Sequence, residues 1–253
     1  MIVNTAAYHF VPVADPQALA AQLYQSAQDN GLRGTVLVAE EGVNLFLAGS
    51  GEGIDAFYRA LQADSRFAQM RVKYSRSRMQ PFARLKAKVK PEIISFRRDD
   101  AQPLDQERAP SVDPQTLQRW LRQGHDDAGR RVVMLDTRNA QEFEYGTFAG
   151  ALTLPIARFT DLPQALEPHR PALADATVVS FCTGGIRCEK AALWMRGDGM
   201  DNVLQLDGGI LGYFEAVGGE GYEGRCFVFD ERVALDPQLQ PLVDRDEPEP
   251  AAA

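Results

Sequence analysis

The stretch TVVSFCTGGIRCEKAALWMR, residues 177–196, carries the strongest structural signal in this chain. Its apolar start, Thr177–Phe181, is typical of a buried strand, the two glycines predict a tight loop, and Glu189–Arg196 predicts a helix. Cys182 is therefore expected at the end of a strand, beneath a loop of backbone N–H groups and at a helix N-terminus. Such an environment stabilises a thiolate and lowers the pKa of a cysteine from ~8.5 toward ~3.5–7.5.

We interpret Cys182 as a reactive cysteine in an anion-binding loop. The loop consists of Thr183, Gly184, Gly185, Ile186 and Arg187, and the arginine adds a fixed positive charge. The alternative is an inert cysteine beside a turn, because free cysteines are commonly buried; two adjacent glycines and an arginine favour the reactive site. Cys188 is either a resolving thiol for a persulfide or sulfenate, or an ordinary cysteine at a helix start.

The apolar runs around this loop predict a doubly wound α/β domain over residues 111–222. Val132–Asp136 and Val203–Leu206 are short and continuous, as in parallel strands buried on both faces. Ligands bind at the carboxyl ends of such strands, where Asp136 and Arg138 either support the site or form a structural ion pair. Asp113 and Pro114 predict the start of a helix over residues 115–122, and residues 208–209 predict a glycine turn.

The first hundred residues predict a ferredoxin-like α+β domain with the order β-α-β-β-α-β. The expected elements are strands 2–13, 34–39, 43–48 and 70–74 and helices 17–30 and 53–63, followed by a basic stretch and a strand over 92–96. The domain boundaries predicted from composition are a ferredoxin-like domain over 1–98, a linker over 99–110, the α/β domain over 111–222 and a C-terminal extension over 223–253. Beyond Phe229 this extension becomes proline-rich and acidic, which predicts disorder.

Composition restricts the class of protein. The chain has 253 residues, of which 45% are hydrophobic, enough for two ordinary domains. No run approaches ~18 apolar residues, so we expect no membrane span, and the N-terminus lacks the pattern of a signal peptide. Three cysteines make no disulfide framework and three scattered histidines make no metal site, so we expect a cytoplasmic protein without a metal or an evident cofactor.

The charge distribution is more informative than the net charge of −8. Residues 71–98 contain ten basic side chains and one acidic side chain, Glu92. Such a cluster is the electrostatic footprint of nucleic-acid binding, and Tyr74 and Phe82 lie within it as candidate stacking groups. The alternative is a solvated positive face with two core aromatics. The RNA-binding candidates are Arg71, Lys73, Arg76, Arg78, Arg84, Lys86, Lys88 and Lys90.

The length of the cysteine loop favours sulfur chemistry. Cysteine-dependent phosphatases have a C-x5-R loop that surrounds a phosphate, whereas Cys182 and Arg187 form a C-x4-R loop. One residue fewer tightens the ring of N–H groups, which should then prefer a persulfide sulfur carried on the cysteine.

Three segments resemble a rhodanese domain: VVMLDTRNAQEFEYGTFAGALTLP (132–155), CTGGIRC (182–188) and LDGGILGY (206–213). The resemblance places Cys182 on the persulfide-bearing cysteine of that family and residues 183–187 on its active-site loop. Residues 146–148 read Gly-Thr-Phe where the family has Gly-His-Ile, so no histidine acts there.

A narrower resemblance covers nearly the whole chain. Residues 40–44 (EEGVN), 81–88 (PFARLKAK), 182–191 (CTGGIRCEKA) and 226–232 (CFVFDER) are similar to the rhodanese-domain tRNA uridine(34) hydroxylases, the UPF0176-type family that forms 5-hydroxyuridine. The resemblance implies oxygen-dependent hydroxylation of C5 of the wobble uridine, with molecular oxygen as co-substrate and the anticodon arm of tRNA as partner. Leu45 and Phe46 depart from it, since the family has Gly-Thr there.

Two functions fit these observations. In the first, the basic N-terminal domain holds the anticodon arm and Cys182 performs or supports uridine hydroxylation. In the second, the protein is a sulfurtransferase that passes sulfur through a Cys182 persulfide. A binding protein with a vestigial rhodanese fold is a third hypothesis, which the intact cysteine disfavours.

Overall fold

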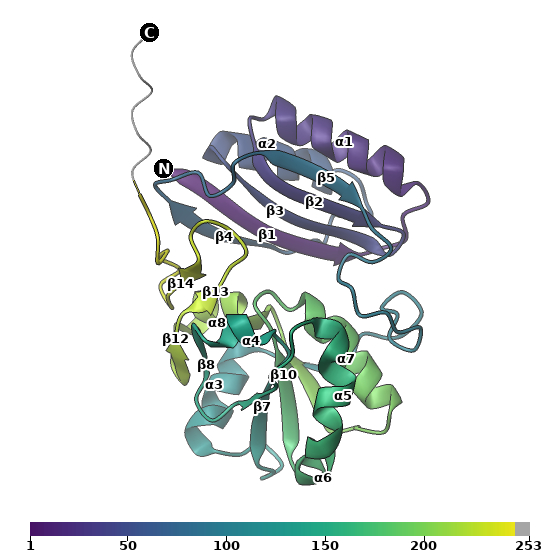
Figure 1. The fold of residues 1–253 in the computed structure, drawn as a ribbon, viewed down its shortest axis with the longest axis vertical. Coiled ribbons are helices and arrows are strands. Elements are labelled where there is room, and N and C mark those ends of the chain that lie inside the picture. Colours follow the sequence, from purple (N-terminus) through teal and green to yellow (C-terminus); the bar gives the residue numbers. More distant parts are fainter. Residues whose placement is uncertain (246–253) are drawn as a thin grey trace. The chain divides into compact units, whose positions relative to one another are not determined.

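The computed structural model describes residues 1–245, which form two compact units (Figure 1). The N-terminal unit contains Met1–Ile93, Phe229–Val233 and the described residues from Gln240 onward. The second unit contains Ile94–Val228 and Ala234–Leu239. The C-terminal part of the chain therefore contributes to both units.

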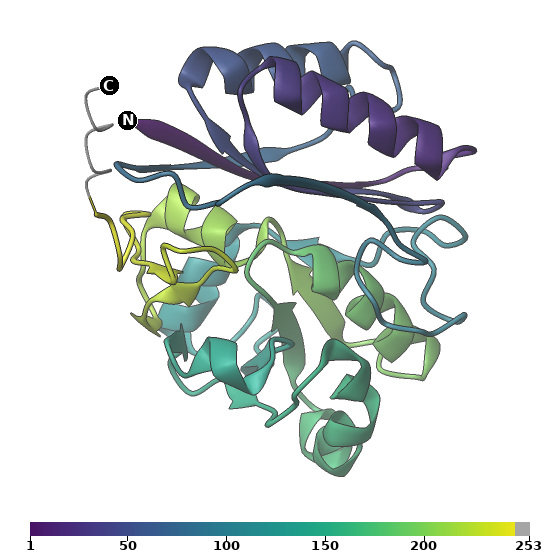
Figure 2. The ribbon, with the colours of Figure 1, turned by 45° about the horizontal axis from the view of Figure 1, so that its top comes forward.

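The N-terminal unit is a five-stranded sheet with the order β4-β1-β3-β2-β5. Two helices, α1 and α2, cover one face of this sheet (Figure 2). The first six elements follow the order β-α-β-β-α-β, as predicted, and β5 adds a strand parallel to β2. The elements are β1 (Ile2–Phe10), α1 (Pro16–Asp29), β2 (Arg33–Ala39), β3 (Gly42–Gly49), α2 (Gly51–Gln62), β4 (Val72–Ser77) and β5 (Leu85–Val89).

Local sequence sets the helix starts in this unit. The Asp15 carboxylate accepts a hydrogen bond from the Ala18 amide, and Pro16 occupies the first turn of α1, as its sequence predicts. The Ser50 hydroxyl caps α2 in the same way by accepting from the Gly53 amide. Both helices place their apolar faces on the sheet, where Leu23 and Phe57 are buried with the inward residues of β1, β2 and β3.

Two expectations about residues 75–96 were wrong. The basic stretch, expected within the N-terminal domain but after its last strand, belongs to the sheet, because its residues extend β4 and form β5. The expected strand over 92–96 is irregular backbone. Its apolar residues are used for packing: Ile93 is buried in the N-terminal unit, and Phe96 stacks on Phe159 in the second unit.

The second unit contains a parallel five-stranded sheet with the order β6-β11-β10-β7-β9. The three predicted strands, β7 (Val132–Asp136), β10 (Thr177–Phe181) and β11 (Val203–Leu206), have the predicted bounds. One core joins α5 and α7 to the sheet and another joins α3 and α8 to it, so the sheet is doubly wound. The other elements are β6 (Ser111–Val112), α3 (Pro114–Gln123), α4 (Ala140–Phe143), β8 (Gly146–Phe148), β9 (Leu152–Thr153), η1 (Phe159–Asp161), α5 (Leu162–Leu166), η2 (Glu167–His169), α6 (Arg170–Leu173), α7 (Ile186–Gly197), α8 (Gly209–Val217), β12 (Tyr222–Gly224), β13 (Cys226–Phe227) and β14 (Ala234–Leu235).

The segments expected to be irregular are packed. Residues 99–110, expected as a linker, belong to the second unit and bury Ala101 and Ala109 in its core. Residues 230–245, expected to be disordered, are described and include β14, which pairs with β13. The rest of the expected disordered end, 246–253, lies outside the described residues. Within residues 1–245, no helix has the length and apolarity needed to cross a membrane.

Candidate active site

Cys182 lies directly after β10, and α7 begins four residues later at Ile186. The intervening loop turns at Gly185, whose φ of +99° lies in the left-handed region that favours glycine. This turn aims the Gly185 amide at the Cys182 Sγ atom, with a nitrogen–sulfur distance of 3.1 Å. The predicted strand–loop–helix arrangement is therefore present, and it places a backbone donor on the thiol.

Cys182 and Cys188 are a hydrogen-bonded pair of buried cysteines. Burial alone would raise the pKa of Cys182. The hydrogen bond from Cys188, the charge of Arg187 and the amides of Arg187 and Gly185 outweigh it, so this pKa is lowered. The pKa of Cys188 is raised well above its ordinary value by burial and by the neighbouring sulfur. Cys182 is thus the thiolate, and Cys188 is a thiol that donates a hydrogen bond to it.

Arg187 is held by a carboxylate that the sequence analysis did not identify. Its Nη1 and Nη2 atoms donate to the two carboxylate oxygens of Glu142 at 2.5 and 2.7 Å, and both side chains are buried. Glu142 comes from α4, a short helix after β7, and its pKa is lowered because Arg187 outweighs the effect of burial. Arg187 therefore has a fixed orientation as well as a charge.

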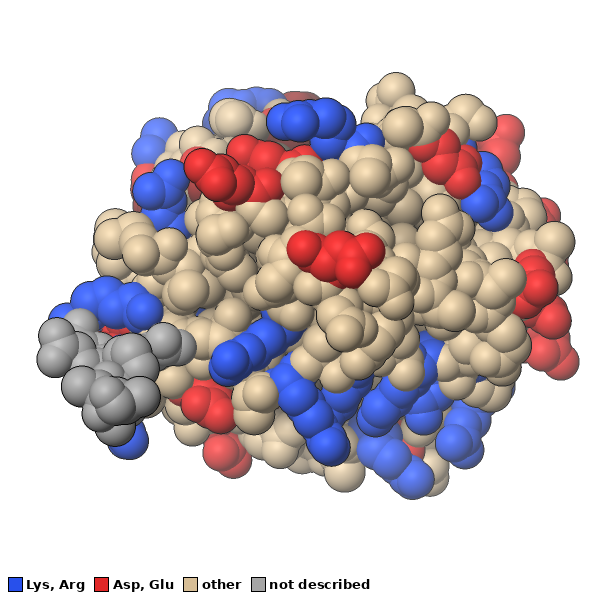
Figure 3. Space-filling view, turned by 90° about the horizontal axis from the view of Figure 1, so that it is seen from above, with Lys and Arg blue, Asp and Glu red and all other residues tan. Residues whose placement is uncertain are grey.

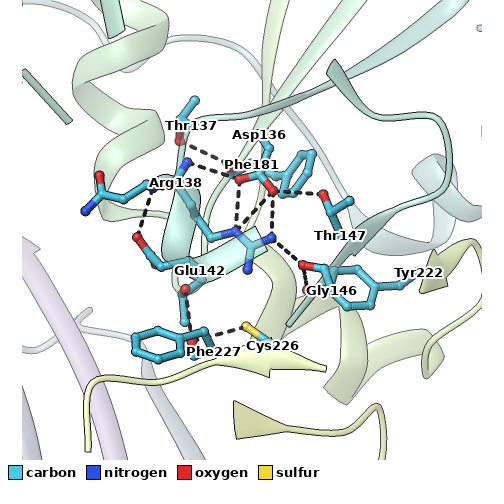
Figure 4. Close-up of polar contacts among 12 residues, drawn as sticks. Asp136, Thr137, Arg138, Glu142, Gly146, Thr147, Phe181, Tyr222, Cys226 and Phe227 are labelled. Carbon is cyan, nitrogen blue, oxygen red and sulfur yellow. Dashed lines mark hydrogen bonds and ion pairs between the residues drawn. The ribbon is translucent and has the colours of Figure 1, made fainter. Parts of the chain in front are cut away.

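Asp136 and Arg138 form an ion pair with no exposed surface, which is the structural alternative considered from the sequence. Arg138 also donates to the carbonyl of Gly146, and the Thr147 hydroxyl donates to Asp136 (Figure 4). The Arg138 Nη1 atom has no hydrogen-bond partner within residues 1–245, and in Figure 4 it points toward Cys226. A buried donor without a partner costs ~1–3 kcal/mol, so Nη1 is the unsatisfied donor of this ion pair.

Cys226 lies beside the cysteine loop, in β13. The Thr183 hydroxyl donates to the carbonyl of Phe227 across 3.4 Å, which ties the loop to this strand. Burial raises the pKa of the Cys226 thiol to about 12, against smaller opposing effects of Arg138 and Thr183. Cys226 is therefore a protonated thiol in the wall of the site.

Gly209 packs directly against the backbone of the cysteine loop. Its φ is +63°, and a Cβ atom at this position would lie 2.5 Å from the Cys182 carbonyl oxygen and 2.6 Å from the Gly185 amide nitrogen. The predicted glycine turn is thus also a close approach between two backbones, because α8 begins directly against the loop.

Arg108 joins the start of α7 to the loop after β11. Its guanidinium donates to Glu189 at 3.0 Å and to Asp207 at 3.1 Å. Residue 108 comes from the expected linker, so sequence reasoning missed this contact. The two ion pairs therefore tie the first turn of α7 to the loop that follows β11.

The basic candidates do not form one cluster within the N-terminal unit. Lys73 and Arg76 lie on β4 and Lys86 and Lys88 on β5, at opposite edges of the sheet. The Arg78 side chain and amide are bonded to Asp244, which neutralises that charge. Arg71, Arg84 and Lys90 are exposed next to strand ends. Figure 3 shows Lys and Arg side chains along the lower margin of this view and others at its upper edge and left side.

The candidate stacking residues differ in position. Tyr74 pairs with Thr5, whose hydroxyl accepts a hydrogen bond from Tyr58 of α2, so Tyr74 lies on the helix-covered face. Phe82 lies in the connection between β4 and β5. Neither belongs to a basic cluster on one face of the sheet.

Two family descriptions match this chain. Residues 2–93 match "UPF0176 acylphosphatase like domain", and residues 114–216 match "Rhodanese-like domain". The chain is 76% identical over 246 residues to the tRNA uridine(34) hydroxylase of Xanthomonas euvesicatoria pv. vesicatoria (strain 85-10), covering 97% of this chain and 99% of that protein. It is 75% identical to the protein of that name from Xanthomonas axonopodis pv. citri (strain 306), with the same coverage. Against that from Xylella fastidiosa (strain M23), identity is 68%, with 96% and 95% of the two chains covered.

Proposed function

This chain belongs to the tRNA uridine(34) hydroxylases, and we propose that it is an oxidoreductase that hydroxylates the wobble uridine of tRNA with Cys182 as its reactive thiol. The observation that carries the role of Cys182 is its setting. The Gly185 amide and the Cys188 thiol donate hydrogen bonds to the Cys182 sulfur, and Arg187 adds a positive charge beside it. All three interactions stabilise the thiolate. A thiolate at the end of a parallel strand is a nucleophile positioned for a ligand.

The reaction replaces C5–H of uracil by C5–OH. We propose that the Cys182 thiolate adds to C6, so that an Sγ–C6 bond forms and the electron pair of the C5=C6 double bond becomes available at C5. C5 then takes one oxygen atom from molecular oxygen, the co-substrate. Loss of the C5 proton and departure of the thiolate with the Sγ–C6 electron pair restore the double bond. We propose that two external thiols, oxidised to a disulfide, supply the two electrons and two protons that convert the second oxygen atom to water.

The partner is tRNA, and we propose that the anticodon arm is the part recognised. Position 34 lies in a single-stranded loop, so the base is reached without opening a duplex. We also propose that the protein acts in the cytoplasm, where its substrate and reducing conditions for three free cysteines are found together.

Nucleoside mass spectrometry of tRNA from cells that lack the gene tests the function. We expect loss of 5-hydroxyuridine and its derivatives, restored by the wild-type gene but not by Cys182→Ser. Incorporation of label from ¹⁸O₂, rather than from H₂¹⁸O, tests the role of oxygen. An anticodon stem-loop with 5-fluorouridine at position 34 should form a covalent adduct with the wild-type protein only, and absence of that adduct would exclude addition to C6.

The second candidate is a sulfurtransferase, which the same thiolate loop favours because a persulfide on Cys182 would receive the same donors. It predicts loss of a thiolated nucleoside, with 5-hydroxyuridine unchanged. Full activity of Cys182→Ser would exclude the proposed role of this residue in either reaction.

A further inference from the structure

Thr137 is a buried residue beside the two thiols of the site, and the reaction proposed above gives it no part. It directly follows β7, as Cys182 directly follows β10, and these two strands are parallel neighbours. Because Asp136 pairs with Phe181 at the strand ends, the next residues, Thr137 and Cys182, lie at the same level of the sheet. The register therefore brings a hydroxyl to the level of the reactive sulfur.

The hydroxyl hydrogen of Thr137 is already used at the end of the neighbouring strand. The Thr137 Oγ1 atom donates to the carbonyl oxygen of Phe181 at 2.9 Å (Figure 4). The Thr137 amide donates to the same oxygen at 3.0 Å. A hydroxyl has one hydrogen and two lone pairs that can accept. With its hydrogen bound to Phe181, the Thr137 hydroxyl is an acceptor for any other neighbour.

That other neighbour is the Cys188 thiol. The Thr137 Oγ1 atom lies 3.8 Å from the Cys188 Sγ atom, and both residues are completely buried. The Cys188 amide donates to the carbonyl of Gly185 at 3.0 Å in the first turn of α7, which holds the backbone of Cys188 in place. A separation of 3.8 Å is at the long end for a hydrogen bond that involves sulfur. It fits an acceptor that the thiol faces while its hydrogen is directed elsewhere.

The Cys188 thiol therefore has one hydrogen and two acceptors, the Cys182 sulfur and the Thr137 oxygen. While Cys182 is a thiolate it takes that hydrogen, because hydrogen bonds to a charged acceptor are roughly twice as strong as those between neutral groups. Addition to C6 of uracil converts this anion to a neutral thioether sulfur, which accepts only weakly. Thr137 is then the better of the two acceptors.

We propose that Thr137 is a positioning residue for hydroxylation, which accepts the Cys188 hydrogen while Cys182 is bonded to the base and releases it when the thiolate departs. The Cys188 S–H bond stays intact, and its hydrogen only turns about the Cβ–Sγ bond. The lone pair of Cys182 forms the Sγ–C6 bond and returns to sulfur when that bond breaks. The buried donor thus has a partner at each stage, and the departing thiolate regains a hydrogen bond. The inference rests on the proposed addition of Cys182 to C6.

Thr137→Val keeps the shape of the side chain but removes the acceptor. A neutral Cys182 sulfur then leaves the Cys188 hydrogen without a good acceptor, so the thiolate is favoured over both the thiol and the thioether. The pKa of Cys182 should therefore fall, with the acid dissociation constant raised about threefold. Thiolate absorbance of each variant, minus that of its Cys182→Ser derivative, measures this pKa.

The same substitution should slow addition to the base. At a pH where Cys182 is fully ionised, the covalent adduct with a stem-loop that carries 5-fluorouridine at position 34 should form about threefold more slowly in Thr137→Val. Thr137→Ser keeps the hydroxyl and should restore both the rate and the pKa. Neither substitution alters Arg187 or the Gly185 amide, which also stabilise the thiolate.

The sign of the change in pKa separates this role from structural damage. A distorted loop would weaken the hydrogen bonds to the thiolate and raise the pKa of Cys182, whereas loss of the second acceptor lowers it. Thr5→Val is the matched control, because the buried Thr5 hydroxyl also donates to a carbonyl, that of Leu47 at 3.1 Å, but in the N-terminal unit. It should change neither measurement. A raised or unchanged pKa in Thr137→Val would overturn the inference.

Infrared spectra report the acceptor directly and do not require a change at Thr137. The S–H stretching band of Cys188 is identified by its loss in Cys188→Ala. In Cys182→Ala, which has no thiolate, this band should stay below the frequency of a free thiol, because Thr137 binds the hydrogen. Adding Thr137→Val should raise the band to the free-thiol frequency. A free-thiol band in Cys182→Ala itself would overturn the inference, even if thermal melting showed that Thr137→Val unfolds the protein.

The inference and the proposed function fail in different ways. A wild-type protein that forms no adduct overturns the proposed addition to C6, whatever the pKa of Cys182 in Thr137→Val. An adduct that forms equally fast in the wild type and in a folded Thr137→Val overturns only the role of Thr137.

Discussion

Glu142 binds both terminal nitrogens of Arg187, at 2.5 and 2.7 Å, although 45 residues separate them in the sequence. The pair places a guanidinium of fixed orientation beside the Cys182 thiolate. It also makes a four-residue helix, α4, part of the site. Because both side chains are buried, each charge is stabilised by the opposite charge of its partner.

Glu142→Gln should destabilise the protein by about 3–5 kcal/mol, since removing one partner of a buried ion pair leaves the other charge uncompensated. Urea unfolding monitored by circular dichroism measures the loss. Glu144→Gln, an exposed residue at the end of the same helix, serves as the control and should change stability by less than about 0.5 kcal/mol. Equal effects of the two substitutions would show that the ion pair is not needed for stability.

Cys188→Ala should raise the pKa of Cys182, because it removes a hydrogen bond to the thiolate. The ultraviolet absorbance of the thiolate, taken as wild type minus Cys182→Ser across a pH series, gives that pKa. Cys188→Ser retains a donor and should stay closer to the wild type. Identical titrations for the alanine and serine variants would contradict the hydrogen bond.

Hydroxylation should persist as the pH falls below ~8.5, where an ordinary cysteine becomes protonated. The pKa of Cys182 is lowered, so the thiolate survives until the pH falls through that lowered value, and activity should then decline on the acid side. Single-turnover rates of hydroxylation of an anticodon stem-loop, measured across this pH range, check the direction of the pH dependence. A rate that rises tenfold per pH unit up to pH 8.5 would indicate an ordinary thiol.

Gly209→Ala should abolish at least nine-tenths of the activity, because its Cβ would lie 2.5 Å from the Cys182 carbonyl oxygen at a positive φ. Gly197→Ala is the matched control: this glycine ends α7, and a Cβ there meets no atom within 4 Å. It should keep full activity and gain a few tenths of a kcal/mol in stability. Single-turnover rates and thermal melting separate loop damage from unfolding, and an active Gly209→Ala would contradict the close approach.

The salt dependence of RNA binding should separate the basic residues. Lys86→Ala combined with Lys88→Ala should reduce the slope of log K against log salt by about 1.4, that is ~0.7 for each single-strand phosphate contact. Arg78→Ala should change it less, because Asp244 already binds that guanidinium. Fluorescence anisotropy over a salt series measures both, and equal changes would indicate a diffuse positive field.

Sequence patterns predicted the elements whose signals are local. The strands β7, β10 and β11 have continuous apolar runs, and Asp15 and Asp113 cap their helices as expected. The loop around Cys182 was predictable because its glycines and its cysteine are adjacent in the sequence.

Features that depend on distant contacts were not predictable in this way. β5 alternates lysine with apolar residues, and its charge concealed a period-2 pattern in which Leu85, Ala87 and Val89 face the core. No local sequence pattern predicts the ion pairs of Glu142 and Arg108, because their partners, Arg187 and Glu189, are distant in the sequence. The alternation in β5 was an available signal that was overlooked.

The contribution of the C-terminal residues to the N-terminal unit has a consequence for protein synthesis. Ser75 and Arg78 meet Arg232 and Asp244 only after the ribosome has added 157 and 166 further residues. β4 is an edge strand, so the nascent N-terminal unit carries an incompletely covered edge throughout translation of the second unit. During that interval we expect the edge to be open to pairing with other chains, so the yield of folded protein should depend on how soon translation completes the C-terminal segment.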